Sequence, residues 1–145
     1  MLPVLAMLLF GIIDFGWAFS QNIDVRHAAR EGGRLAAVNA STGGDADSRR
    51  DSLIAQIRLR SPELEDDQTA VYISLRDDDN DANAGERGET VVVCIRYPLR
   101  SISGATTTLL SGDLSTKTVM RMEQVATFSS GGSTNPAWGT NPCEP

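Results

Sequence analysis

The chain has 145 residues, 41% of them hydrophobic and 22% charged, and its formal net charge is −6 with an isoelectric point near 4.7. Phosphate binding requires a clustered basic surface, so this balance argues against nucleic acid as a partner. Without its apolar N-terminal run, the chain keeps about 120 residues, which fits one small domain.

An apolar run opens the chain, and only Pro3 and Asp14 in residues 2–19 are neither apolar nor small. A helix over this run is about 27 Å long, close to the roughly 30 Å of a bilayer core. A cleaved signal peptide would need a basic n-region, a shorter apolar stretch and a small-residue cleavage site. A buried core helix would need a larger domain. We therefore favour a transmembrane helix over residues 1–19 that continues as an amphipathic stalk helix over residues 20–38.

Asp14 is the one charge inside this run. A carboxylate at mid-bilayer costs roughly 2.5 to 3.5 kcal/mol on insertion scales, so such a residue usually faces a partner. Two interpretations stay open. Asp14 pairs with a group on a neighbouring helix, or it lies shallow, near the outer interface that Trp17 marks.

The stalk carries a stripe of mostly small residues at helical spacing, namely Val25, Ala28, Ala29, Gly32 and Ala36. Gly32 and Gly33 each cost a helix up to about 1 kcal/mol relative to alanine, so close packing against another helix is expected to compensate. A second face repeats arginine at positions 26, 30 and 34. His27 stands alone, which predicts an ordinary surface histidine.

The rest of the chain, residues 39–145, predicts an α+β domain. After a turn at 39–44, Leu53, Ile54 and Ile57 give the buried face of a short helix. Asp47 or Ser48 is expected to cap it, and Pro62 to end it. Alternating apolar residues predict three strands, around 71–76, 91–97 and 116–124, in a small antiparallel meander packed on the helices. Residues 129–145 read as a tail rich in Gly, Ser and Pro.

The loop between the first two strands is acidic. Asp77, Asp79 and Asp81 echo the opening of a calcium-binding loop. The match then fails, because the sixth position is Ala82 instead of glycine and the twelfth is Gly88 instead of glutamate. We interpret the segment as a solvated hairpin loop, and the three aspartates stay weak calcium candidates.

Cys94 and Cys143 allow a single pairing. In an oxidising compartment this disulfide would close a loop of about 50 residues and stabilise the fold by up to roughly 4 kcal/mol. We favour the disulfide because nothing else would hold the tail; two unrelated buried thiols are the alternative. The single histidine and the lack of a nucleophile elbow, phosphate loop or Cys/His metal set predict a protein that is not an enzyme and needs no cofactor.

The N-terminal residues resemble a known family. Residues 11–16 (GIIDFG), followed by residues 27–34 (HAAREGGR), are similar to the signature of TadE-like minor pseudopilins of tight-adherence (Flp) pilus systems. The family belongs to the type IV pilus and type II secretion group, and the resemblance covers about the first forty residues. Residues of this chain that match the motif are Phe15, Gly16, Arg30, Glu31, Gly32 and Arg34.

The resemblance implies a pilin-like fold and a structural role in pilus assembly by lateral helix packing. It implies a single-pass protein of the cytoplasmic membrane with its C-terminal domain outside the cytoplasm, either retained there or incorporated in the pilus. Its partners would be other pilin or pseudopilin subunits and inner-membrane assembly proteins. A basic prepilin leader would lie upstream of Met1, through an earlier start or a trimmed chain, unless this member bypasses the prepilin peptidase.

The runner-up interpretation is a signal-anchored or secreted binding or adhesion module with weak calcium binding. Its contact surfaces would be Trp138 and the acidic loop.

Overall fold

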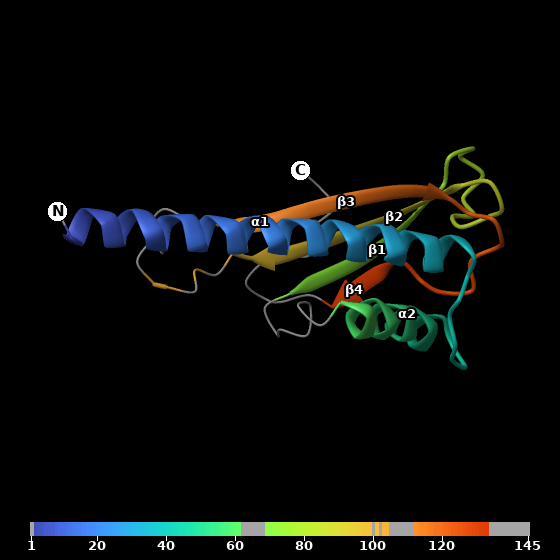
Figure 1. The fold of residues 1–145 in the computed structure, drawn as a ribbon. Coiled ribbons are helices and arrows are strands. Elements are labelled where there is room, and N and C mark those ends of the chain that lie inside the picture. Colours follow the sequence, from blue (N-terminus) through green and yellow to red (C-terminus); the bar gives the residue numbers. More distant parts are fainter. Residues whose placement is uncertain (1, 62–68, 100, 102, 105–111, 134–145) are drawn as a thin grey trace.

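The computed structural model describes residues 2–61, 69–99, 101, 103–104 and 112–133. The molecule is elongated, and the helix α1 (Leu2–Ala37) runs along most of its length. Figure 1 shows that the C-terminal half of α1 lies on a β-sheet, while its N-terminal half extends beyond the strands. The transmembrane and stalk segments predicted from the sequence are therefore parts of one continuous helix.

The sheet consists of β1 (Ala70–Arg76), β2 (Thr90–Pro98), β3 (Asp113–Arg121) and β4 (Gly131–Ser133), in the order β3-β2-β1-β4. All neighbouring strands are antiparallel. The predicted α+β class with a long apolar helix, a second helix and an antiparallel sheet is confirmed. The predicted number of three strands is wrong, because β4 adds a fourth at the edge of β1.

The fourth strand was missed because it has no apolar residue. It pairs Gly132 with Tyr72 and begins the segment that the sequence presents as a tail. A Cβ on Gly132 would lie 2.7 Å from the Cα of Tyr72, closer than real side chains come. Glycine is therefore required here by the close approach of two backbones, a reason that leaves no hydrophobic pattern.

The third strand begins and ends three residues earlier than the predicted range of 116–124. It pairs with the full length of β2, from Pro98 opposite Asp113 to Thr90 opposite Arg121. Met122 lies just past the strand, is buried, and donates its backbone N–H to the Glu89 carbonyl. The buried methionine suggested a longer strand than the pairing with β2 allows.

The second helix, α2 (Ala46–Arg60), buries Leu53, Ile54 and Ile57 as predicted. Its N-cap is Asp45, whose carboxylate accepts hydrogen bonds from the Ser48 backbone N–H at 3.2 Å and from the Ser48 hydroxyl at 2.6 Å. The predicted cap at Asp47 or Ser48 is wrong, because both residues already belong to the first helical turn. Pro62, the predicted stop, lies outside the described residues.

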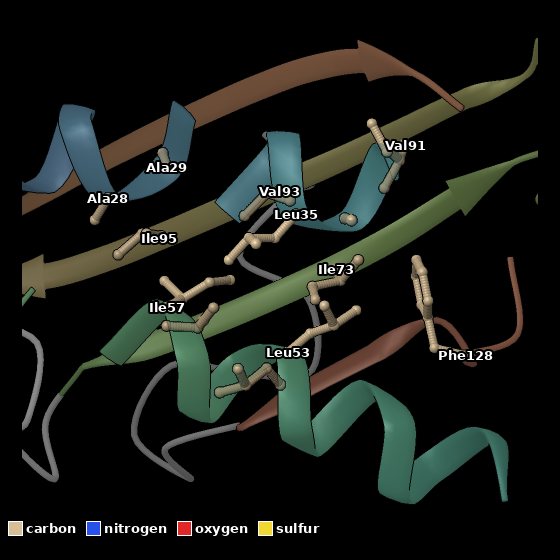
Figure 2. Packing of buried hydrophobic residues seen from close by; sticks show 14 of the residues in the cluster. Ala28, Ala29, Leu35, Leu53, Ile57, Ile73, Val91, Val93, Ile95 and Phe128 are labelled. Atoms are coloured by element: carbon tan, nitrogen blue, oxygen red, sulfur yellow. The ribbon is translucent and has the colours of Figure 1, made fainter. Parts of the chain in front are cut away.

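Both helices pack on one face of the sheet. Figure 2 shows Leu53 and Ile57 of α2 pointing toward the strands, with Ala28 and Ala29 of α1 facing the same layer. Strand residues that complete this layer are Ile73, Val91, Val93 and Ile95. Because alternate side chains point to opposite faces of a strand, Val92 and Cys94 lie on the face away from the helices.

The predicted turn after α1 is present and fixes the end of the long helix. Asn39 has a φ of 51°, the left-handed conformation in which asparagine often ends helices. The Ala40 N–H bonds to the Leu35 carbonyl at 2.9 Å, and the Asn39 side chain donates to the Val125 carbonyl at 3.1 Å. The turn therefore anchors the C-terminal end of α1 to the domain.

Candidate functional site

The small-residue stripe of α1 is buried inside the chain. Its five members, Val25, Ala28, Ala29, Gly32 and Ala36, lie against the sheet and α2. A Cβ on Gly32 would lie 2.7 Å from Ile57 Cδ1 and 3.4 Å from Val93 Cγ1. The close packing predicted from the two glycines is therefore present, but the chain's own domain fills it. These five residues are therefore not available to a neighbouring helix.

Gly33 extends the same contact toward the edge strand. A Cβ there would lie 3.1 Å from Thr118 Cγ2 and 3.2 Å from Met120 Sδ. The two adjacent glycines thus contact different neighbours, because Gly32 faces α2 and β2 whereas Gly33 faces β3.

Glu31 joins the two helices. Its carboxylate accepts from the guanidinium of Arg60 at the end of α2, and Arg34 lies 3.9 Å away on the same helix. Arg34 is 76% exposed, so its ion pair contributes little to stability. His27 is exposed. Among the motif residues, Glu31 and Gly32 thus contact the rest of the domain. The other four, Phe15, Gly16, Arg30 and Arg34, are exposed.

Asp14 is 1% exposed and finds its partners within the chain. Its carboxylate accepts hydrogen bonds from the Ser101 hydroxyl at 2.8 Å, the Ser103 backbone N–H at 3.0 Å and the Ser103 hydroxyl. These donors belong to the segment that follows β2. The carboxylate is therefore satisfied without a neighbouring helix and without direct exposure to water, and its depth in a membrane stays a prediction.

The opposite face of α1 exposes large apolar side chains, which we call the outer stripe. At 100° per residue, the residues of this stripe fall on one side of the helix, roughly opposite Asp14 and Gly32. In the N-terminal part of α1, Met7, Phe10 and Ile13 are exposed on the other sides as well. Phe15 is 68% exposed, Phe19 63% and Ile23 42%. Members of the outer stripe are Leu5, Leu8, Ile12, Phe15, Phe19 and Ile23. A continuous exposed apolar surface of this length requires lipid or a protein partner.

The apolar helix is compatible with a single-pass membrane anchor. From Pro3 to Ala37 it is long enough to cross a bilayer, its mean hydropathy reaches 1.7, and only 6% of that apolar window is buried. The alternative of a buried core helix is therefore wrong for the N-terminal half of α1.

The acidic loop gathers carboxylates in a different combination from the predicted one. Oxygens of Asp77, Asp79 and Glu89 lie within 4.8 Å of one another, whereas Asp81 is not part of this group. Sequence reasoning missed Glu89 because it follows the expected twelfth position of a calcium loop by one residue. The one feature of the sequence that could have indicated Glu89 is its position directly before β2.

Backbone N–H groups already bind two of these carboxylates. Glu89 accepts from Asp78, Gly85 and Glu86, and it is buried. Burial alone would raise the pKa of Asp77, but bonds from the N–H groups of residues 82, 80 and 81 outweigh it and hold that pKa below its usual value. Burial, followed by repulsion from Asp81, raises the pKa of Asp79. Asp77 and Glu89 therefore hold the backbone of the loop in its conformation through these hydrogen bonds.

Cys94 is buried on the sheet face away from the helices. Its predicted partner Cys143 and the aromatic contact residue Trp138 lie outside the described residues. The Cys94–Cys143 disulfide therefore stays a prediction.

The helix α1 carries the exposed apolar face, the glycine pair packed against the domain, and the GIIDFG and HAAREGGR motifs. It is also the part of the chain that is similar to known proteins. Residues 1–34 match the family model described as TadE-like protein. The N-terminal segment is therefore similar to that of TadE-like proteins. Searches of curated proteins and of solved structures found no match. The TadE-like match confirms the resemblance drawn from Phe15, Gly16 and the residues around Gly32, and it suggests a role in Tad pilus systems.

Proposed function

We propose that this chain is a membrane-anchored minor pseudopilin that takes part in assembly of a tight-adherence (Flp) pilus. Its N-terminal helix would pack laterally against other pilin subunits and inner-membrane assembly proteins. The role is structural and involves neither a reaction nor a cofactor. The observation that carries the proposal is the outer stripe, which stays exposed at Phe19 and Ile23, where the domain covers the opposite face of α1.

The contacts of Asp14 support the proposal of a protein partner for the C-terminal part of the outer stripe, at Phe19 and Ile23. Irregular backbone exposed to lipid does not occur within the hydrocarbon region, so the segment that bonds Asp14 through Ser101 and Ser103 belongs at or beyond the membrane boundary. At 1.5 Å per residue, Phe19 and Ile23 lie about 8 and 14 Å further along the helix. We therefore propose that the membrane boundary lies near Asp14, earlier than the residue 19 expected from the sequence. These exposed side chains then extend past the lipid, where another helix is the natural cover.

The same contacts favour an anchored protein over a secreted one. A signal peptidase cut near Ser20 would remove Asp14 and leave the donors of Ser101 and Ser103 without their acceptor. The domain therefore uses part of the apolar segment that secretion would discard. An uncut helix with its domain outside the cytoplasm is the arrangement we propose.

A pair of substitutions at Phe19 tests the proposal. Phe19→Arg places a charge in the outer stripe beyond Asp14, whereas Phe19→Leu keeps the position apolar and serves as the matched control. Pili sheared from cells and total membranes are assayed by immunoblotting. We expect Phe19→Arg to lose assembled pili while the protein stays in the membrane, and Phe19→Leu to match the wild type. Normal pili from the arginine variant would contradict lateral packing through this face.

A further inference from the structure

A basic groove lies on the exposed face of α1, bordered by the end of α2 and by Met120 of β3. It has a volume of about 390 Å³ and is lined by His27, Arg30 and Arg34 of α1 and by Arg60 at the end of α2. Glu31 is the acidic residue in it and is engaged with Arg60 and Arg34. Three guanidinium groups therefore face one carboxylate, and Arg30 forms no ion pair within the described part of the chain. The groove carries an excess of positive charge.

The acidic loop carries an excess of negative charge. Asp78, Asp79, Asp81 and Glu86 are exposed. Repulsion from Asp81 is the largest cause that raises the pKa of Glu86, with burial and Asp79 adding to it. Figure 1 shows the loop at one end of the molecule, past the C-terminal end of α1. The described residues therefore leave this end with carboxylates that repel one another.

We propose that the acidic loop of one copy of this chain docks into the basic groove of a second copy. The contact deepens the proposed function, on which it rests, by naming a head-to-tail electrostatic contact between neighbouring subunits. Charge complementarity within one sequence argues for a second copy, because every copy carries both the groove and the loop. A contact of this heterologous kind repeats from subunit to subunit.

Positions along α1 are consistent with such a contact. The groove lies at residues 27–34, whereas the loop lies next to the end of the helix, where the Glu123 N–H bonds to the Ala37 carbonyl and the Met122 N–H to the Glu89 carbonyl. Two copies with the same orientation in the membrane must therefore be displaced by at least about 10 Å along the helix axis. The outer stripe is about 27 Å long from Leu5 to Ile23, so helices staggered in this way still overlap.

A membrane surface is a poor occupant for the groove. His27 is thirteen residues beyond Asp14, which places the groove about 20 Å from the proposed membrane boundary. Charges in solution are screened over about 8 Å at physiological ionic strength, so lipid headgroups would act on the groove only weakly.

Zero-length cross-linking tests the contact in membranes that contain the full chain. A carbodiimide joins lysine amines to carboxylates, and Lys117 is the single lysine of the sequence. Arg34→Lys keeps the charge of the groove and introduces one amine there. Lys117, exposed on the other face of the sheet, is the internal control. Isotopically light and heavy copies are mixed, so that mass spectrometry separates links between copies from links within one. A photoreactive side chain at Phe19 reports helix packing in the same membranes.

The expected result is a link between position 34 of one copy and Asp79, Asp81 or Glu86 of another, while Lys117 forms no link to these carboxylates. Links from Phe19 to other subunits without a link from position 34 to the loop would overturn the contact and leave the proposed function standing. Loss of both kinds of link would count against both proposals. Links from position 34 to a different protein would overturn the second copy as occupant.

A charge swap gives an independent readout. Arg30→Glu with Arg34→Glu reverses the groove, and Asp79→Lys with Glu86→Lys reverses the loop. Each pair alone is expected to lose assembled pili, and all four changes together to restore them. Damage to the fold would not be restored by combination, because the groove and the loop are separate within one copy. A combined variant no better than either pair would overturn the proposal.

Discussion

Gly32→Ala adds one methyl group at the tightest point between α1 and the domain. The new Cβ would lie 2.7 Å from Ile57 Cδ1 and 3.0 Å from Ile57 Cγ1. Ile57 is 1% exposed, so its side chain has little room to move away. Figure 2 shows Ile57 and Val93 in the layer where this methyl group would enter.

Two opposing terms set the magnitude. Alanine favours a helix interior over glycine by about 1 kcal/mol. Overpacking a core by a methyl group costs about 1 to 3 kcal/mol. We therefore expect Gly32→Ala to lower the free energy of unfolding by about 1 kcal/mol, within a range of about 0 to 2.

A second substitution identifies the cause. Ile57→Val removes Cδ1, the atom nearest to the new Cβ, and by itself costs about 0.5 to 1.5 kcal/mol. The combined variant keeps the gain in helix propensity without that clash, so it should be more stable than the sum of the single changes by about 1 to 2 kcal/mol. Urea unfolding in a mild detergent, followed by circular dichroism, measures all four proteins.

Gly16→Ala is the matched control on the same helix, because a Cβ at Gly16 meets nothing within 4 Å. It should not lower the free energy of unfolding. Additive effects of Gly32→Ala and Ile57→Val, or a Gly32→Ala protein more stable than the wild type, would refute the packing of Gly32 against Ile57.

Three further predictions follow from other parts of the fold. Asp14→Ala leaves the Ser103 N–H and its neighbouring hydroxyls without their acceptor and should cost about 1 to 3 kcal/mol, seen as faster hydrogen exchange at Ser103, whereas Asp14→Asn should lose less. The exported protein should resist thiol alkylation until it is reduced, if Cys94 and Cys143 are bonded; alkylation of both without reductant would rule the disulfide out. Hydrogen bonds from the Ser48 side chain and backbone hold the pKa of Asp45 below its usual 3.8, so its stabilisation of α2 is present above that pH and is lost as the pH falls through the lower folded value. Asp45→Ala should therefore destabilise the protein at neutral pH, with an effect that fades in acid; an effect independent of pH would contradict the cap.

The sequence predicts the elements whose apolar residues recur with the period of a strand or a helix. In β2, alternate residues such as Val91 and Val93 face the helices, and in α2 Leu53 and Ile57 share one face. The ends of the helices and the short strand β4 were less predictable. Asp45, Asp47 and Ser48 are all good capping residues, and only the hydrogen bond to Asp45 distinguishes them.

The candidate site was predictable in kind but not in its partners. The glycine pair indicates close packing, yet a stripe of small residues fits a sheet as well as a helix, and pattern alone cannot choose Val93 over a neighbouring subunit. Asp14 indicates a partner for a buried carboxylate, but Ser101 and Ser103 lie 87 and 89 residues away in a segment without regular pattern. Long-range contacts of this kind carry no local signal.

We propose that an intact α1 anchors the chain in the membrane and presents the outer stripe to other pilus subunits. Cell fractionation with mass spectrometry of the native protein tests it most directly, by giving its N-terminus and its membrane association together. We expect a membrane-bound chain that retains the helix through Asp14 and Phe19. A soluble chain cut near Ser20 would contradict it and leave a secreted binding domain in its place.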